Sequence, residues 1–163
     1  MQNLKFRQGL PDDLDVLIEL ERRCFSESEA ADRITFELRM KSFSRCFWVL
    51  EDDGQIVCMI NGMTTNHKDL CDTMYENTDL YSPDGDWLMI FGVATLPSNQ
   101  KSGYASKLMY HVIEETKQQG RQGIVLTCKK NLIPFYCRFG FISEGISDSV
   151  HGGAEWYQMR LSF

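Results

Sequence analysis

Residues 100–105 (Gln-Lys-Ser-Gly-Tyr-Ala) form a short polar turn between an apolar run, residues 87–94, and a helical pattern, residues 106–119. The first amide N–H groups of a helix have no partners within the helix, and the helix dipole adds partial positive charge there. A strand that leads through such a turn into a helix is therefore suited to bind an anion, and we expect it to hold a diphosphate. Taken alone the pattern is weak, because it is neither the Walker sequence nor Gly-x-Gly-x-x-Gly.

A second pattern lies further along the chain, in residues 132–141 (Leu-Ile-Pro-Phe-Tyr-Cys-Arg-Phe-Gly-Phe). It predicts a short helix that carries Tyr136 and stops at Gly140, directly before a strand that begins with Phe141. Tyr136 has two interpretations: an aromatic side chain of the core, or a phenol that acts in chemistry. The functional interpretation requires its hydroxyl group to lie near the predicted diphosphate-binding turn.

Two helices are expected near the N-terminus, after a strand at residues 4–7. The first helix begins at Pro11, whose fixed backbone suits a first turn, and ends near residue 25. Asp32 is expected to cap the second helix, which ends near residue 44. The residues at helical spacing in this second helix, and hence its expected apolar stripe, are Ile34, Leu38 and Met40 or Lys41.

Asp53-Gly54 separates two apolar runs, residues 47–50 and 56–60, and this arrangement is a strong hairpin signal. Gly62 follows the second run and suggests a bulge, a close backbone approach or the end of the strand. Residues 66–86 are polar and mixed, with at most one short helical turn at 72–75. A loop of this length inside a compact domain is often functional.

The C-terminal half predicts a βαβ unit. Residues 87–96 are apolar throughout, as expected of a strand covered on both faces, and residues 124–128 form another such strand. The helix between them makes the two strands parallel. Two last strands, residues 141–146 and 154–161, are expected to form a hairpin. The whole chain, residues 1–163, is therefore expected to be a single α/β domain.

The composition is that of a globular protein, with 43% hydrophobic and 25% charged residues and a net charge of −6. The negative charge argues against a nucleic-acid partner and is compatible with a cationic substrate. No apolar run is long enough for a membrane span and no signal peptide is visible, so a cytoplasmic location is the expectation. The six cysteines lack Cys-x-x-Cys spacing, so we expect structural thiols, and we expect no metal site.

The two patterns together, Gln-x-x-Gly-x-Ala at 100–105 and Pro-Phe-Tyr-x-x-x-Gly-Phe at 134–141, resemble those of the GNAT superfamily of acyl-CoA N-acyltransferases. Further segments are similar to the bacterial branch related to arylalkylamine N-acetyltransferases, namely Cys24-Phe25 with Glu29-Ala30-Ala31, Ile60-Asn61-Gly62, Thr127-Cys128-Lys129 and His151-Gly152-Gly153. The resemblance implies an α/β (α+β) fold, with a mixed, centrally splayed sheet of about six to seven strands flanked by about four helices. It also implies direct transfer of an acetyl group from acetyl-CoA to a primary amine.

In this family two neighbouring parallel strands, here residues 87–95 and 124–128, separate and admit the pantetheine arm. The resemblance places the diphosphate on the amides of the turn, and Tyr136 beside the thioester sulfur, where it protonates the departing thiolate. Lys101 has an alternative interpretation as an exposed, solvated side chain. The cofactor-binding residues implied are Val93, Ala94, Thr95, Gln100, Lys101, Ser102, Gly103, Tyr104, Ala105, Ser106, Phe135 and Tyr136.

The sequence leaves the general base open. Arylalkylamine enzymes of vertebrates carry a His-x-His pair on the strand before the turn, where this chain has Met89 and Phe91. The candidate replacements are Glu29, Asp86 and His151. Glu29 has alternative interpretations as an ammonium-binding group or a helix cap, and His151 as a solvated loop residue. The candidate substrate-binding residues are Phe25, Glu29 and Phe91.

Three functions stay open at this point. The first is acetylation of a small (aryl)alkylamine, and the second is acetylation of a protein N-terminus or lysine, with residues 66–86 forming or covering a peptide groove. The third is a non-catalytic acyl-CoA-binding module, which the missing histidine pair favours and Tyr136 opposes. A homodimer is also left open.

Overall fold

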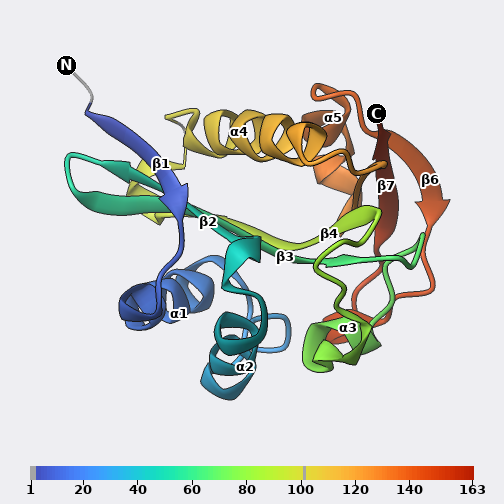
Figure 1. Ribbon diagram of the computed structural model, residues 1–163, viewed down its shortest axis with the longest axis horizontal. Coiled ribbons are helices and arrows are strands. Elements are labelled where there is room, and N and C mark those ends of the chain that lie inside the picture. Colours follow the sequence, from blue (N-terminus) through green and yellow to red (C-terminus); the bar gives the residue numbers. More distant parts are fainter. Residues whose placement is uncertain (1–2, 101) are drawn as a thin grey trace. The chain divides into compact units, whose positions relative to one another are not determined.

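The computed structural model describes residues 3–100 and 102–163. Within them lie a seven-stranded sheet of order β1-β2-β3-β4-β5-β7-β6 and five α-helices (Figure 1). The strands are β1 (Leu4–Gln8), β2 (Phe47–Asp52), β3 (Gln55–Thr65), β4 (Trp87–Thr95), β5 (Gly123–Cys128), β6 (Ile142–Ile146) and β7 (Tyr157–Ser162). The helices are α1 (Leu14–Cys24), α2 (Arg33–Phe43), α3 (Thr73–Glu76), α4 (Tyr104–Gln118) and α5 (Ile133–Cys137). The predicted mixed-sheet α/β class is confirmed.

Two compact units divide the chain. The first comprises the residues up to Gly62 together with Gly92–Val112, and the second comprises Met63–Phe91 and Ile113–Phe163. The long elements β3, β4 and α4 therefore contribute residues to both units. The single domain expected from the sequence stays a prediction.

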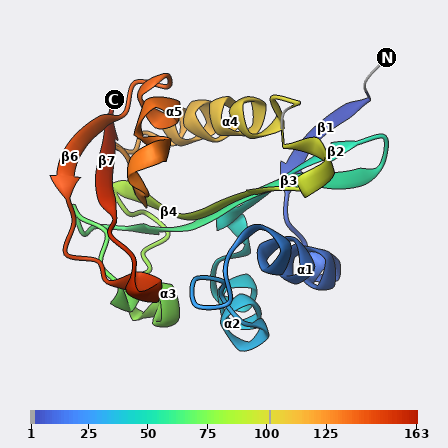
Figure 2. The same cartoon turned by 180° about the vertical axis from the view of Figure 1, so that it is seen from behind.

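In the first unit, β1, β2 and the beginning of β3 pair antiparallel. Helices α1 and α2 lie on one face of these strands, and the first half of α4 lies on the other (Figures 1 and 2). The turn from β2 to β3 has positive φ at both Asp53 (52°) and Gly54 (83°). Such a turn matches the twist of its flanking strands, and the predicted hairpin is confirmed. Fully buried side chains that fill this core include Leu17, Phe36, Phe47 and Met59.

Helix α2 buries Met40, as its spacing suggested, but the rest of its buried stripe differs from the expected one. Asp32 caps the helix as predicted, because its side chain accepts a hydrogen bond from the Thr35 amide at 2.9 Å. However, Ile34 and Leu38 are 76% and 39% exposed, respectively. The buried stripe contains two aromatic rings, whose burial removes more apolar surface from water than burial of these two side chains would. The buried residues are Phe36, Arg39, Met40 and Phe43.

Strand β3 continues through Gly62 to Thr65, so the strand end suggested for this glycine is wrong. The register of the hairpin shifts elsewhere in β3. Leu50 pairs with Cys58 and Glu51 pairs with Ile56, which leaves Val57 of β3 as an extra residue. Such a bulge bends the strand that carries it and increases its local twist.

In the second unit, β4 pairs with β5 in parallel, from Trp87 opposite Gly123 to Ile90 opposite Leu126, as predicted. β7 pairs antiparallel with both β5 and β6, so the last strand of the chain lies between them. The predicted terminal hairpin is therefore confirmed, and the sheet order adds that its second strand is the inner one. Helix α3 lies on one face of these strands, and α5 lies with the end of α4 on the other (Figures 1 and 2).

Asp13 connects the start of α1 to β1 through hydrogen bonds. Its carboxylate accepts two bonds from Arg7, at 2.7 and 2.9 Å, and one from the Leu10 amide at 2.7 Å. The hydrogen bond from Arg7 holds the pKa of Asp13 below its ordinary value. A carboxylate with a lowered folded-state pKa adds stability above its unfolded-state pKa, and the addition is lost as the pH falls through the folded-state value.

We therefore expect Asp13→Asn to lower the free energy of unfolding at pH 7 by about 1 kcal/mol, because asparagine removes the charge and one of the two oxygens that bond to Arg7. The difference from the wild type should shrink below pH 3.8, the ordinary pKa of this carboxyl group, as the wild-type Asp13 becomes protonated. Thermal unfolding of both proteins from pH 7 to pH 2.5 measures this difference in the free energy of unfolding. Asp15→Asn is the matched control, because the Asp15 side chain is 84% exposed. A difference that stays constant down to the lowest pH would contradict this account.

Candidate functional site

The turn between β4 and α4 has the backbone of an anion site. A 3-10 turn, Pro97–Asn99, ends β4, and the Ser102 amide then donates to the Asn99 carbonyl at 3.1 Å. Gly103 has a φ of 77°, a conformation in which glycine has no steric penalty, and it turns the chain into α4. The first helical hydrogen bond runs from the Lys107 amide to the Gly103 carbonyl at 3.1 Å. The amides of Ala105 and Ser106 lie ahead of this bond and are suited to bind an anion.

The side chains of the predicted turn residues differ in their surroundings. Gln100 is exposed, and its amide nitrogen lies 3.5 Å from the Thr95 carbonyl. Tyr104 is 3% exposed, and its hydroxyl donates a short hydrogen bond to the Asp52 carboxylate on β2. Its phenol therefore fastens the start of α4 to the hairpin, and its contribution to an anion site would come from the backbone. Lys101 lies outside the described residues.

At the end of β4, some backbone peptide groups bond to β3 and others point away from it. The Leu96 amide donates to the Val57 carbonyl on β3 at 2.9 Å. Because successive residues of a strand turn their peptide groups to opposite edges, Val93 and Thr95 turn theirs away from β3. The Thr95 carbonyl there accepts a hydrogen bond from the Cys24 thiol at 3.0 Å. Ala94, the third residue predicted to line the cofactor, has its side chain buried in the core.

Tyr136 is held rigidly on α5 in the second unit. Its side chain is 7% exposed and makes edge contacts with the rings of Phe135 and Phe141, at centroid distances of 5.0 and 5.9 Å. Gly140, with a φ of 101°, ends the helical segment as predicted, and its amide donates to the Cys137 carbonyl at 3.0 Å. The ring thus packs in the core of the second unit, and a catalytic role of its hydroxyl group stays a prediction.

An aromatic group in the second unit includes two of the predicted residues. The ring of Tyr75 stacks on His151 at 4.6 Å and lies 5.1 Å from Phe91, and its hydroxyl is 3.3 Å from the Thr127 hydroxyl on β5. Trp156 extends the group, with its ring 6.0 Å from His151. His151 is therefore not a solvated loop residue: it is half-buried between two aromatic rings. Tyr75 was missed because its loop, residues 66–86, shows no periodic pattern.

Asp72 ties this loop to the C-terminal loop that carries His151. Its carboxylate accepts hydrogen bonds from the Ser149 hydroxyl and from the Val150 amide, the latter at 3.0 Å. The Trp156 indole N–H donates to the His151 carbonyl at 2.8 Å. These bonds hold the stacked rings of Tyr75 and His151 in place.

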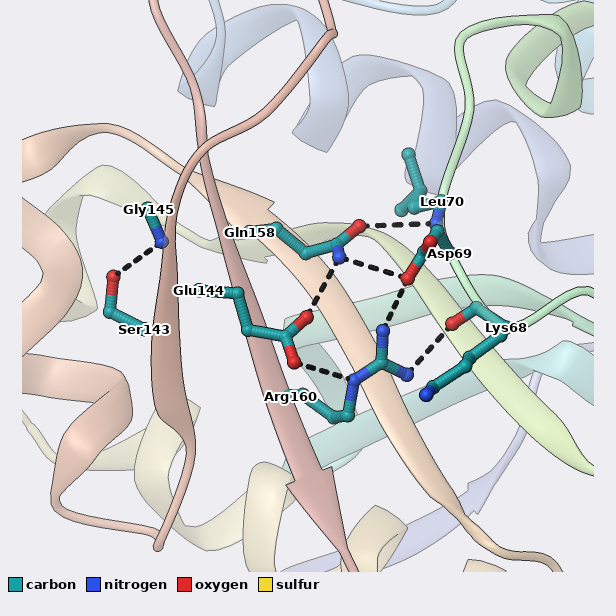
Figure 3. A network of polar contacts seen from close by, with 8 residues as sticks. All are labelled: Lys68, Asp69, Leu70, Ser143, Glu144, Gly145, Gln158 and Arg160. Atoms are coloured by element: carbon teal, nitrogen blue, oxygen red, sulfur yellow. Dashed lines mark hydrogen bonds and ion pairs between the residues drawn. The ribbon is translucent and has the colours of Figure 1, made fainter.

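Two arginines anchor the loop at its ends. The Arg160 guanidinium donates to the Lys68 carbonyl at 2.8 Å, to Glu144 at 2.9 Å and to Asp69, and it lies 4.8 Å from the centroid of the Trp87 ring (Figure 3). Arg121 donates to the carbonyls of Pro83 and Gly85 near the other end. Loop residues 66–86 are thus a fixed part of the second unit. Their helical turn α3 lies where the sequence predicted one, but a second turn, the 3-10 turn Thr78–Leu80, was not expected.

A bulge in β6 makes the Arg160 contact possible. The β6–β7 register shifts between Ser143 and Ile146, which turns Glu144 toward the Arg160 and Gln158 side chains (Figure 3). The hydrogen bond from Arg160 lowers the pKa of Glu144 below its ordinary value.

We expect Arg160→Met to loosen loop residues 66–86 without unfolding the protein. Methionine keeps the apolar stem over Trp87 but removes the three donor contacts, and the two carboxylates left behind are exposed enough to be hydrated. Amide hydrogen exchange should accelerate by at least about tenfold across this loop, which corresponds to about 1.4 kcal/mol. Arg45→Met, at an exposed residue of the first unit, is the control. Unchanged exchange in the loop would show that Arg160 does not anchor it.

The two remaining candidate bases, Glu29 and Asp86, belong to different units. Glu29 is half-buried in the connector between α1 and α2, and its amide donates to the Ser26 carbonyl at 2.9 Å. Asp86 is exposed at the start of β4, and Met89 is fully buried within it. Glu29 belongs to the first unit, and Asp86 belongs to the second with His151. The role of base stays a prediction for each.

The first unit also contains a buried polar group that sequence reasoning missed. Glu21, Arg39 and Asn61 are 6%, 3% and 1% exposed, and an Arg39 guanidinium nitrogen donates to the Asn61 side-chain oxygen at 3.1 Å. Phe25, a predicted substrate-binding residue, is half-buried and lies beside Gly92 of β4. The sequence feature that could have indicated this group is Glu21, a glutamate on the core-facing stripe of α1.

The expected structural role of the thiols fits the buried Cys46, Cys58 and Cys128, whereas Cys71 and Cys137 are exposed. None of the six, all of which are described, is in a disulfide. Burial raises the pKa of Cys58 and of Cys128 to about 11, so both are protonated at neutral pH and are poor nucleophiles. Among the described residues, no group of three or more His, Cys, Asp or Glu side chains is arranged to hold a metal ion. No helix in the described part of the chain is long and apolar enough to cross a bilayer.

Comparison with known proteins gives a family match and similar structures. The model of the acetyltransferase (GNAT) family matches residues 14–141, well over half of the chain. The GNAT-like decarboxylase GphF in complex with isobutyryl-CoA is 20% identical, with a TM-score of 0.84 over 97% of this chain and 98% of that one. The ribosomal-protein-S18-alanine N-acetyltransferase from Escherichia coli is 17% identical, with a TM-score of 0.72 over 98% and 93%. A GNAT family acetyltransferase from Brucella melitensis in complex with acetyl-CoA is 18% identical, with a TM-score of 0.65 over 100% and 90%.

Proposed function

Because the chain belongs to the acetyltransferase (GNAT) family and is therefore an acyltransferase enzyme, we propose that it transfers an acetyl group from acetyl-CoA to a small arylalkylamine. Transfer is direct, within a ternary complex of enzyme, donor and amine. The observation that carries the donor half is the turn from β4 into α4, where Gly103 precedes amides that lie ahead of the first helical hydrogen bond. GNAT acetyltransferases use acetyl-CoA as donor, and this turn suits its diphosphate.

The residues of this chain have separate tasks on the donor side of the proposed reaction. Amides of the first turn of α4 hold the diphosphate, and the β4 edge at Val93 and Thr95 hydrogen-bonds to the pantetheine arm. Tyr136 lies beside the sulfur and donates its proton as the carbon–sulfur bond breaks. The amine nitrogen forms the new bond to the carbonyl carbon, and CoA leaves as the thiol.

On the acceptor side the enzyme must overcome the basicity of the amine. An alkylammonium group has a pKa near the lysine value of about 10.4, so forming the free base at pH 7 costs about 4–5 kcal/mol. Alignment of the amine with the thioester is the larger contribution, up to about 7–11 kcal/mol in ideal cases, whereas a general base typically adds about 10²–10⁴-fold. Glu29 and His151 remain the proposed bases.

The aromatic group of Tyr75, Phe91 and His151 supports an aryl group on the acceptor. These rings are packed against one another at 4.6–5.1 Å, and Asp72 fixes the two loops that carry two of them. Preorganised rings bind a planar aromatic substrate without the entropy cost of ordering mobile side chains.

Two other acceptors or reactions have support from similar structures. Likeness to the E. coli alanine N-acetyltransferase favours a peptide N-terminus as the second candidate. The anchored ends of loop 66–86 count against it, since a fixed loop leaves less room for a chain. Likeness to GphF raises loss of CO₂ from a carboxyacyl-CoA as a further reaction of the same donor site.

One assay separates these functions. Purified protein is incubated with acetyl-CoA and phenethylamine, an alkylamine or an N-terminal peptide, and thiol release is followed; malonyl-CoA is tested separately for release of CO₂. We expect thiol release to be fastest with phenethylamine. Release only with the peptide would replace the proposed acceptor, and CO₂ release without any amine acetylation would replace the reaction.

A further inference from the structure

The turn from β4 into α4 is an exposed segment that bonds mainly to itself. Most of residues 97–100 and 102–103 are exposed. Every hydrogen bond that these residues make with other described residues ends within residues 95–107. Exposed segments with few contacts to the rest of a protein are the ones that open most readily. The position of this turn therefore depends on the elements that hold its two ends.

The β2–β3 hairpin holds both ends of the turn. Before the turn, the Leu96 amide donates to the Val57 carbonyl on β3 at 2.9 Å. After the turn, the Tyr104 hydroxyl donates its short hydrogen bond to the Asp52 carboxylate on β2. The Tyr104 side chain is buried and that of Asp52 is half-buried, so water competes little for this bond. A hydrogen bond to a carboxylate is also stronger than one between two neutral groups.

The charge of Asp52 does not by itself explain why a carboxylate lies here. A negative charge near a diphosphate site repels the ligand, so electrostatics alone would favour a neutral residue. The bond to Tyr104 is the compensating advantage. Tyr104 directly precedes Ala105 and Ser106, whose amides lie ahead of the first helical hydrogen bond. The donors of a binding site must be held close to their productive geometry, and this bond holds the end of the helix that carries them.

We propose that Asp52 is a positioning residue of the donor site. It acts through Tyr104 and not by contact with the diphosphate: it holds the first turn of α4 on the same hairpin that holds the end of β4. This inference rests on the proposed N-acetyltransferase function, and it makes the β2–β3 hairpin a support of the acetyl-CoA site.

Two variants remove the bond, one from each side. Asp52→Ala removes the acceptor, and Tyr104→Phe removes the donor while it keeps the buried ring. We expect each to raise the Kd for acetyl-CoA, measured by calorimetry, at least fivefold, with the KM for phenethylamine within twofold of the wild type. The double variant should bind within twofold of either single variant, because both changes remove the same bond. Loss of a negative charge would by itself tighten binding of the diphosphate, so the expected weakening distinguishes positioning from charge.

Two further variants complete the comparison. Asp52→Asn keeps a side-chain oxygen that can accept the bond from Tyr104, so we expect its Kd for acetyl-CoA to stay within twofold of the wild type. Glu51→Ala is the matched control, because Glu51 is also half-buried on β2 but bonds to Arg7. We expect this control to bind acetyl-CoA like the wild type even if its melting temperature falls.

Two results would overturn the inference. The first is an unchanged or lower Kd in Asp52→Ala and Tyr104→Phe. The second is an equal rise of the Kd in Glu51→Ala, which would indicate a general loosening of the hairpin. Tyr104→Phe decides the test alone if Asp52→Ala does not fold.

Binding by the wild type separates this inference from the proposed function. A wild type that does not bind acetyl-CoA refutes the proposed donor, and amide hydrogen exchange of residues 102–107 then decides the inference. Exchange at least fivefold faster in Tyr104→Phe and unchanged in Glu51→Ala supports the positioning role of Asp52. Equal exchange in Tyr104→Phe and the wild type overturns it.

Discussion

Replacing Tyr136 with phenylalanine is expected to lower kcat at least tenfold while the affinity for acetyl-CoA stays near the wild-type value. The variant retains the ring that packs against Phe135 and Phe141 and removes only the hydroxyl group. A phenol, with a pKa of about 10, is a weaker acid than a thiol of about 8.5, so complete transfer to a relaxed thiolate is uphill by about 2 kcal/mol. The hydroxyl therefore acts mainly while the thiolate is forming, which places its effect at or below the lower end of the usual general-acid range of about 10²–10⁴.

Steady-state kinetics with phenethylamine and calorimetry with acetyl-CoA measure the two quantities separately. Tyr157→Phe is the matched control, because it removes a phenol of the same unit whose hydroxyl bonds to the Glu155 side chain. We expect this control to match the wild type in both measurements. Unchanged turnover in Tyr136→Phe would exclude the acid role, and weaker acetyl-CoA binding at unchanged kcat would make Tyr136 a binding residue.

Introducing aspartate at Ala105 is expected to weaken acetyl-CoA binding at least tenfold, a loss of about 1.4 kcal/mol or more. The new carboxylate lies in the first turn of α4, where it repels the diphosphate and competes with it for the same amides. The helix itself should tolerate the change, because an acid at this end gains about 0.3–1 kcal/mol from the dipole, which offsets the lower helix propensity of aspartate. Binding and stability should therefore change independently.

Calorimetry with acetyl-CoA and thermal unfolding test this separation. Gln118→Glu is the matched control, because it adds the same charge at the exposed last residue of α4, far along the helix from the turn. We expect the control to bind acetyl-CoA like the wild type. Equal binding by Ala105→Asp would remove the start of α4 from the donor site and with it the observation on which the donor half of the proposal depends.

The turn of the proposed donor site could be predicted because its residues are close together in the sequence. Asp32 at a helix start, Asp53-Gly54 in a hairpin and Gly140 at a helix end each act through backbone conformation or a hydrogen bond only a few residues long. The same holds for the turn before α4, whose anion-binding character depends on local backbone geometry and on the following helix. Features of this kind depend on neighbouring residues only, so the sequence alone can predict them.

The residues of the proposed acceptor side are brought together by contacts between distant segments. Tyr75 contacts Thr127 and His151, which are too distant in the sequence for a periodic pattern to predict the contacts. Arg160 likewise bonds to a loop that lies far earlier in the chain. Which stripe of α2 is buried depended likewise on the volume available against the sheet.

Glu21 shows the division most clearly. Helical spacing alone places a glutamate on the core-facing stripe of α1, because it fixes which residues share a face. That Gly92 of β4 lies opposite the carboxylate follows only from the way α1 packs on the sheet. Side-chain packing between distant segments, and not backbone preference, determines such pairs.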